Sequence, residues 1–135
     1  AGYLQFEHVQ LRERLHLLTE SVESFQASAT AERQAMLNRL RTLGLISDEE
    51  ADDADSHIPQ IVEAMHAMLR KSPSLLIQAA LVDGVGERRT QNQPGTSDQY
   101  PNWRIPLADE HGRVVHTDEV FDLPRVKSLA AIMDA

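Results

Sequence analysis

One short apolar run constrains the fold of this chain more than any other feature. It is LLIQAALV at residues 75–82, and it follows a segment at 56–72 with the pattern of an amphipathic helix. A nearly continuous apolar run of this length is typical of a strand buried on both faces, and a helix followed by such a strand is half of a β/α repeat. One strand cannot form a sheet. We therefore expect a mainly α chain with one or two short strands, cut from a longer protein, as the opening at Ala1 rather than Met also indicates.

Four helices are predicted before this run, in a helical segment at residues 1–72. The first covers 6–18 and has one apolar face. The small and polar stretch 19–29 is expected to connect it to a second helix, which Thr30 caps and Gly44 ends.

The other two helices of this segment have clear start signals. Ser47 and Glu50 form a capping box before a third helix that begins at Asp48. Ser56 caps the fourth helix, with Pro59 in its first turn. The apolar stripe of the fourth helix is formed by Ile61, Val62, Met65, Met68 and Leu69.

The second part of the chain, residues 73–135, combines the predicted strand with a long loop and a closing helix. Residues 83–107 are rich in glycine, proline, amides and hydroxyls, and a loop of this length inside a compact domain is usually functional. A small turn is expected at His111–Gly112. Asp122 caps the closing helix, which is expected to end near Met133.

Composition excludes several classes of function. The formal net charge is -8 and no Lys/Arg cluster offsets it, so we expect no nucleic-acid partner and no anionic membrane surface. No apolar run approaches the roughly 20 residues of a membrane helix. The chain has no cysteine, which removes thiolate catalysis and cysteine-ligated zinc and is compatible with the cytoplasm.

No residue pattern predicts a catalytic centre, a metal site or a cofactor site. Glu63 and His66 have the spacing of a bundle metal site, but the motif occurs once, so a surface pair is favoured. Gly84-Val85-Gly86 lacks the third glycine of a phosphate loop and indicates a turn. Asp83, at the end of the predicted strand, lies where barrel enzymes carry active groups, although a turn or cap residue is favoured.

The most informative segment is QNQPGTSDQYPNWR, at residues 91–104. Rigid points at Pro94 and Gly95 stand beside Asn92, Asn102 and the only tryptophan, Trp103. Sugar hydroxyls need amide partners in fixed places, and the apolar face of a sugar stacks on an aromatic ring. The alternative is that Trp103 plugs the base of a loop while Asn92 and Asn102 bond to backbone groups. The residues alone leave both interpretations open.

The same segment resembles the Asn-x-Pro-Gly-Thr-x-x-x-x-Pro-Asn-Trp-Arg stretch of the bacterial 4-α-glucanotransferase family, which includes amylomaltases and disproportionating enzymes. The stretches 72–86 and 1–18 are also similar to this family, whereas 19–71 looks like a variable helical insertion. One departure is that Ala79, Ala80 and Val82 stand where relatives often carry Gln or Glu.

The resemblance implies a (β/α)8 barrel with helical insertions, of which this chain would supply the last strand, the loop at the mouth and the closing helix. Family members transfer α-1,4-glucan segments from a malto-oligosaccharide donor to glucose or a malto-oligosaccharide acceptor, by a retaining double displacement without a cofactor. In this family three carboxylates carry out the reaction, and all three would precede Ala1. The chain alone is therefore expected to be inactive, and the residues expected to shape the sugar site are Asn92, Pro94, Gly95, Asn102 and Trp103.

Two other functions fit parts of the sequence. A non-enzymic helical interaction module would use residues 1–72 as a bundle and 83–107 as a peptide-docking loop. A carbohydrate-binding module would need several exposed aromatics, and the chain has one tryptophan. For the isolated piece of a glucanotransferase, an unpaired strand at 75–82 would favour self-association of the chain.

Overall fold

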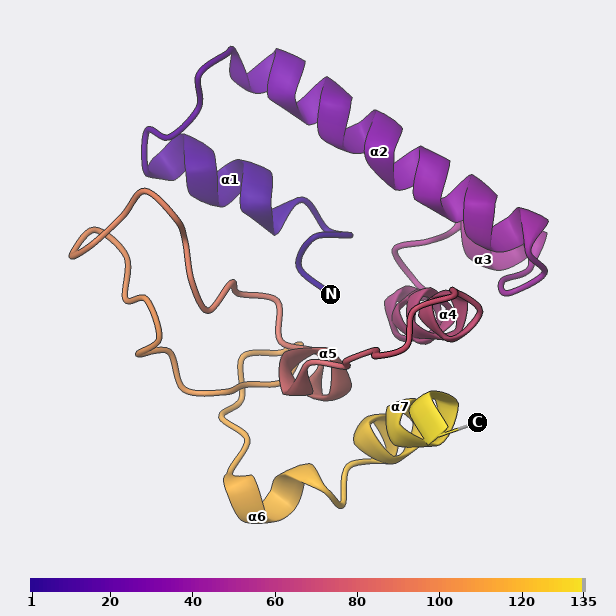
Figure 1. The fold of residues 1–135 in the computed structure, drawn as a ribbon. Coiled ribbons are helices and arrows are strands. Elements are labelled where there is room, and N and C mark those ends of the chain that lie inside the picture. The colour runs from indigo at the N-terminus through magenta and orange to yellow at the C-terminus, as the bar shows by residue number, and fades with distance from the viewer. Residues whose placement is uncertain (135) are drawn as a thin grey trace.

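The computed structural model describes residues 1–134, which form seven α-helices and no β-strand (Figure 1). Ala108 and Val114 make a single antiparallel bridge, which closes the expected turn at His111–Gly112. The helices are α1 (Glu7–Arg14), α2 (Val22–Thr42), α3 (Asp48–Asp52), α4 (Ile58–Arg70), α5 (Leu81–Val85), α6 (Thr117–Val120) and α7 (Pro124–Asp134).

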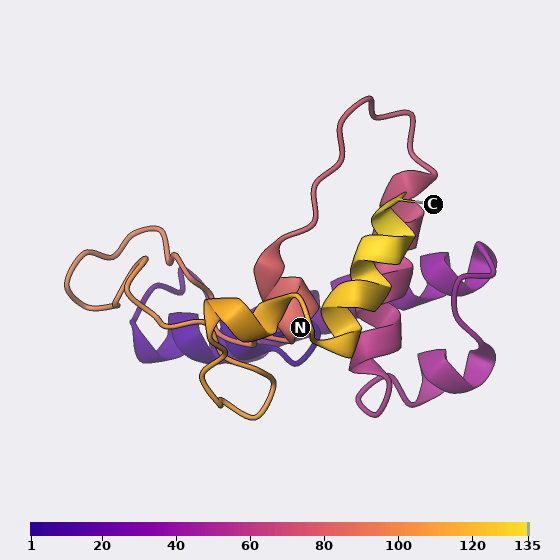
Figure 2. The ribbon, with the colours of Figure 1, turned by 90° about the horizontal axis from the view of Figure 1, so that it is seen from below.

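The predicted strand at residues 75–82 is wrong for this structure. Residues 75–80 have no ladder partner, and α5 begins at Leu81. Figure 2 shows this segment arching away from the rest of the chain between α4 and α5. Leu75 and Leu76 are 105% and 89% exposed. A strand is held by hydrogen bonds to a neighbouring strand, and residues 1–134 provide none, so the apolar run stays extended and exposed.

The predicted connection at residues 19–29 is also wrong, because α2 begins at Val22. Ser21 caps it by accepting a hydrogen bond from the Ser24 N–H at 3.1 Å. Thr30, the expected cap, lies inside the helix and donates to the Gln26 carbonyl at 2.8 Å. The stretch holds no glycine or proline, so its weak helix propensity is enough once Ser21 provides the start.

The starts of the other helices before residue 72 lie closer to the positions predicted from the sequence. The capping box of α3 is confirmed, with Glu50 accepting from the Ser47 N–H at 2.7 Å. Pro59 lies in the first turn of α4, although His57 and not Ser56 is the N-cap. The first helix is shorter than predicted because His16 adopts a left-handed φ of 56° just after its end.

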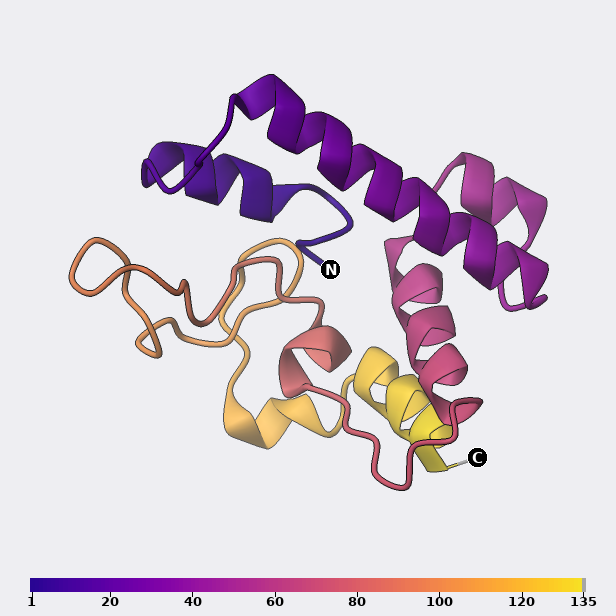
Figure 3. The same cartoon turned by 45° about the horizontal axis from the view of Figure 1, so that its top comes forward.

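The larger hydrophobic core lies between α2, α3 and α4. Figure 3 shows α2 passing over the start of α4, and the fully buried Leu40 of α2 and Ile61 of α4 belong to this core. The remaining buried members are Leu4, Leu37, Ile46, Ala51, Ala54, Ile58, Val62 and Ala64.

A smaller core holds the second part of the chain. Val85 of α5 packs with Val115 and with Val120 of α6, a short helix that the sequence did not predict. α7 packs against both α4 and α5, so it joins the two cores. Gly84 allows this approach, because a Cβ there would lie 3.1 Å from the Val126 side chain of α7. The long loop therefore begins at Gly86, whose φ of 82° ends α5, rather than at Asp83 as predicted.

We expect Leu40→Ala to lower the free energy of unfolding of the 135-residue chain by about 2–5 kcal/mol, because it leaves a cavity in the larger core. Leu75→Ala removes the same atoms from a fully exposed side chain and should change it by less than about 0.5 kcal/mol. Urea denaturation followed by circular dichroism measures both. A large effect of Leu75→Ala in this chain would contradict the exposed position of residues 75–80.

Candidate functional site

A buried carboxylate holds the two ends of the long loop together. Glu87 is 4% exposed and accepts hydrogen bonds from the backbone N–H groups of Arg88 and Arg89 at 3.0 and 2.9 Å. Its other oxygen accepts from the N–H of Ala108 at 3.0 Å, on the far side of the loop. The Arg89 guanidinium donates to both Glu87 oxygens and to the Pro106 carbonyl at 2.8 Å. We call these five residues, Glu87, Arg88, Arg89, Pro106 and Ala108, the Glu87 cluster.

The Glu87 cluster fixes the ionisation of its carboxyl. Burial alone would raise the pKa of Glu87, but the hydrogen bonds from the Arg89 side chain and backbone, with the charge of Arg89 and the Ala108 N–H, more than offset it. The net pKa lies below the ordinary value of 4.5. Glu87 is therefore a carboxylate near neutral pH, and its role is to hold the backbone of the loop.

Asn102 holds the tip of the same loop. Its Oδ1 accepts from the Gln93 N–H at 2.7 Å, and its Nδ2 donates to the Thr96 hydroxyl at 2.9 Å. The Thr96 hydroxyl in turn donates to the Gln93 carbonyl at 2.6 Å. We call residues 91–104 the motif loop. Both polar atoms of the Asn102 side chain are bonded within the motif loop. This agrees with the alternative in which Asn102 stabilises the loop rather than binding a sugar.

Trp103 is presented at the surface of the motif loop. Its side chain is 76% exposed, so it does not plug the base of the loop. Its backbone has a left-handed φ of 60°, which is uncommon for a tryptophan. The Trp103 N–H donates to the Gln91 carbonyl at 2.8 Å, and the Tyr100 hydroxyl donates to the Thr90 carbonyl at 2.6 Å. These bonds across the loop hold the strained residue in place.

The other three predicted residues lie on the side of the motif loop that faces the first two helices. Asn92 is exposed, and its side-chain amide makes no hydrogen bond within the described residues. Gly95 has a φ of 86°, and a Cβ there would lie 3.6 Å from Leu17, just after α1. Asn92 and Pro94 line a cavity described below, whereas Trp103 and Asn102 do not. The five predicted residues therefore share one loop but do not surround one cavity.

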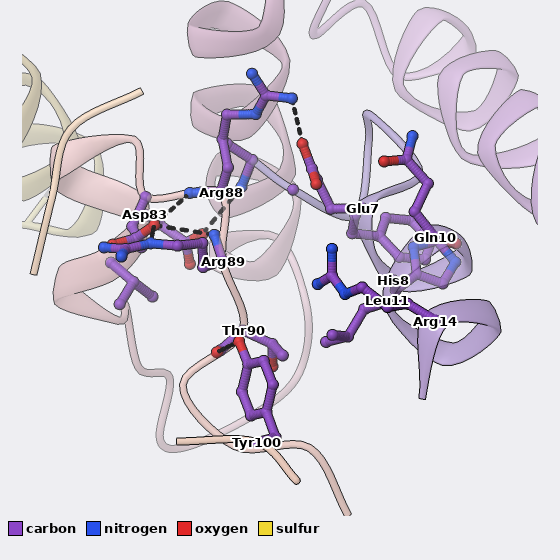
Figure 4. Close-up of a pocket in the computed structure, with 15 residues that line it drawn as sticks. Glu7, His8, Gln10, Leu11, Arg14, Asp83, Arg88, Arg89, Thr90 and Tyr100 are labelled. Carbon is purple, nitrogen blue, oxygen red and sulfur yellow. Dashed lines mark hydrogen bonds and ion pairs between the residues drawn. The ribbon is translucent and has the colours of Figure 1, made fainter. Parts of the chain in front are cut away.

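A first cavity, of about 270 Å³, lies between α1 and the start of the long loop (Figure 4). Arg88 reaches across it to pair with Glu7 of α1. Gly2 packs directly on the backbone of Arg88, where a Cβ would overlap the Arg88 carbonyl oxygen. The first residues of the chain and the loop are therefore fixed against each other, although they are more than 80 positions apart.

A second cavity, of about 430 Å³, lies between α1, α2 and the motif loop, and we call it the α1–α2 cavity. It shares Tyr3, His8 and Thr90 with the first cavity, so the two are neighbours along α1. The residues that line it are Tyr3, His8, Arg12, Phe25, Ser28, Ala29, Glu32, Thr90, Asn92, Gln93 and Pro94.

The Glu63–His66 pair is not the surface pair that the sequence predicted, because His66 is only 7% exposed. Its Nδ1 donates to the Val62 carbonyl at 2.8 Å, and its Nε2 lies 3.7 Å from the Asp83 carboxylate. Asp83 lies in the first turn of α5, near the cap position that was favoured for it. Among residues 1–134, no group of three or more His, Asp or Glu side chains is arranged to hold a metal ion. In the same range, no helix combines the length and apolar character that crossing a bilayer requires.

Sequence reasoning missed Glu87 and the aromatic side chains of the α1–α2 cavity. Glu87 precedes two arginines and has the pattern of an exposed charged run, so no local signal indicates that it is buried. Tyr3 and His8 lie at the start of the chain and Phe25 lies on α2, so Phe25 meets His8 only because α1 and α2 pack together.

We expect Glu87→Gln to lower the free energy of unfolding by about 1–3 kcal/mol at pH 7, because a neutral amide cannot accept all the hydrogen bonds that the carboxylate accepts. Because the pKa of Glu87 is lower in the folded state, its stabilisation is full above pH 4.5 and is lost as the pH falls through the folded-state pKa. The difference between the unmodified protein and the variant should therefore shrink on acidification.

Glu13→Gln is the matched control for this measurement, because Glu13 is exposed on α1 and makes no side-chain bond within the described residues. Urea denaturation at pH 7 and at successively lower pH values follows all three proteins. Equal stability of the Glu87 and Glu13 variants at pH 7 would contradict the role of the Glu87 cluster.

Comparison with known proteins identifies the family. A family model described as 4-alpha-glucanotransferase matches residues 5–111. The 4-alpha-glucanotransferases of Mycobacterium bovis and Mycobacterium tuberculosis are each 44% identical over all 135 residues, and the chain spans 18% of their length. The crystal structure of amylomaltase from Corynebacterium glutamicum matches 98% of this chain and 20% of its own with a TM-score of 0.87 and 34% identity. The match covers both the helical segment and the motif loop, and the chain belongs to the 4-α-glucanotransferase family.

Proposed function

We propose that this chain is the part of a 4-α-glucanotransferase that presents the motif loop to malto-oligosaccharides. The observation that carries the proposal is the division of roles within the motif loop. Asn102 fixes its backbone and the Glu87 cluster holds the ends of the long loop that carries it, while the Trp103 ring and the Asn92 amide stay exposed and available. A preorganised loop with a free aromatic ring and a free amide suits a sugar, whose apolar face stacks and whose hydroxyls bond.

The chemistry assigned to the whole protein is a retaining double displacement. One carboxylate attacks the anomeric carbon and expels the leaving sugar, which a second carboxylic acid protonates. The same second group then deprotonates the 4-hydroxyl of the acceptor, which displaces the enzyme carboxylate. These carboxylates are proposed to lie in the part of the protein that precedes residue 1, so this chain alone catalyses no transfer.

In this proposal the five predicted residues have unequal roles. Trp103 stacks on a glucose ring and Asn92 bonds to a hydroxyl. Asn102, Pro94 and Gly95 act on the shape of the motif loop, since the Asn102 side chain is already bonded within it and Gly95 supplies a left-handed turn.

The division of the chain into residues 1–72 and 73–135 is part of the same proposal. Residues 75–82 become the last strand of a barrel when neighbouring strands of the full-length protein lie beside them, and α7 is the closing helix. The exposure of Leu75 and Leu76 supports this, because apolar side chains of this size are normally covered. Without those neighbours the isolated chain has a surface for self-association.

The compartment is proposed to be the cytoplasm, which is compatible with a chain free of cysteine.

We expect Trp103→Ala in the full-length protein to lower kcat/KM for glucose release from maltotriose about tenfold, because a stacking contact of about 1.4 kcal/mol is lost. Alanine and tryptophan face the same backbone strain at a φ of 60°, so the change reports on the ring. Phe121→Ala is the matched control, since Phe121 is also exposed, at 69%, but lies outside the motif loop. An unchanged kcat/KM in a folded Trp103 variant would refute the assigned role of Trp103.

A further inference from the structure

The α1–α2 cavity has the composition of a sugar subsite, although no pattern in the sequence singles it out. Three separate parts of the chain form it: the segment around α1, the first half of α2 and residues 90–94 of the long loop. Figure 1 shows α1 between α2 and this loop. Pockets lined by aromatic rings with a few convergent polar groups are the usual form of small-molecule sites.

Aromatic rings line one side of the cavity. Tyr3 and His8 are stacked, with ring centroids 5.0 Å apart and an interplanar angle of 19°. Phe25 of α2 meets His8 edge-on, with centroids 6.2 Å apart. Tyr3 is 40% exposed, so part of its ring is open to a ligand. A flat aromatic surface of this kind matches the apolar face of a glucose unit.

The polar groups of the cavity favour a neutral, hydroxyl-rich ligand. The Glu32 carboxylate accepts from the Tyr3 hydroxyl at 3.2 Å, and the Arg12 guanidinium lies 5.5 Å above the Phe25 ring. A phosphate or carboxylate ligand would be repelled by Glu32, and a cation by Arg12. Sugar hydroxyls can donate a hydrogen bond to the Glu32 carboxylate and accept one from the Arg12 guanidinium.

His8 strengthens this argument. Its Nδ1 is buried and has no hydrogen-bond partner within the described residues, which is uncommon for a buried polar atom. Burial, followed by the nearby charge of Arg12, lowers the pKa of His8 below its ordinary value. A neutral imidazole ring adds an uncharged aromatic surface to the cavity, as the apolar face of a sugar requires.

The cavity is continuous with the motif loop, because Asn92, Gln93 and Pro94 line it. We propose that the α1–α2 cavity is a remote subsite that binds glucose units of a long α-1,4-glucan, away from the bond that is cleaved. This inference rests on the proposed function. Its consequence is a preference for long donors over short ones, because only a long glucan reaches both the cavity and the Trp103 ring, which does not line the cavity.

The experiment compares kcat/KM for transfer from maltoheptaose and from maltotriose in the full-length protein. Ser28→Leu places extra bulk in the cavity from an exposed position of α2, and Glu32→Gln removes the charge of its carboxylate. Each variant should lower the ratio of the maltoheptaose value to the maltotriose value about fivefold, which corresponds to the loss of one hydrogen bond or contact.

Two substitutions on the same helix are matched controls. Ala35→Leu adds the same side chain, and Glu23→Gln makes the same charge change, at exposed positions that do not line the cavity. Both should keep the ratio of the unmodified protein.

The outcomes separate this inference from the proposed function. If the unmodified protein transfers glucose units and folded Ser28 and Glu32 variants keep its donor ratio, the remote subsite is refuted and the proposed function stands. If the unmodified protein transfers from neither donor, the proposed function fails and the subsite fails with it. A lowered ratio in both cavity variants, with unchanged controls, supports the subsite.

Discussion

The carboxylate of Glu87 is the interaction on which the second part of the chain depends. It accepts from N–H groups at both ends of a loop of about 20 residues, and within residues 1–134 no strand or helix links these ends in its place. Closing such a loop costs conformational entropy, and the cost is offset here by charge-assisted hydrogen bonds in a buried setting. Because Arg89 also bonds to the Pro106 carbonyl, the loop leaves and returns at one fixed point. Asn102 can then fix the tip, since its partners Gln93 and Thr96 are already close.

Much of the helical part could be predicted from the sequence, because its signals are local. The Ser47–Glu50 capping box placed the start of α3, and the apolar stripe that includes Ile61 identified α4 as a buried helix. The start of α2 could not be placed with the same certainty, because Ser21 and Thr30 are both reasonable caps and the residues between them have weak preferences. Ser21 proved to be the cap, and Phe25 and Ala29 of the first turns then lie on the side of α2 that faces α1 and the loop.

The apolar run at 75–82 shows a different limit. Its pattern describes an environment buried on both faces, which residues 1–134 do not provide. In this structure Leu81 and Val82 instead begin α5, and Val85 packs in the smaller core. The candidate site shows the same limit: the motif predicted Asn92 and Trp103 as sugar contacts, but Phe25 of α2 meets His8 only because α1 and α2 pack together. Residues that act through distant partners carry no local pattern that identifies them.

The geometry of Trp103 connects loop stability to the proposed binding of sugars. A tryptophan at a φ of 60° is strained, and such strain persists only where surrounding bonds fix the backbone. Here the N–H of Trp103 is bonded to Gln91, and the preceding Asn102 is bonded on both sides of its amide. The ring is therefore exposed at a fixed place on the motif loop, with little backbone freedom left to lose when a ligand stacks on it. Asn92 and Pro94 of the same loop line the α1–α2 cavity, and the Thr90 hydroxyl donates to the Asn92 carbonyl, so the bonds within the loop also shape one side of the cavity.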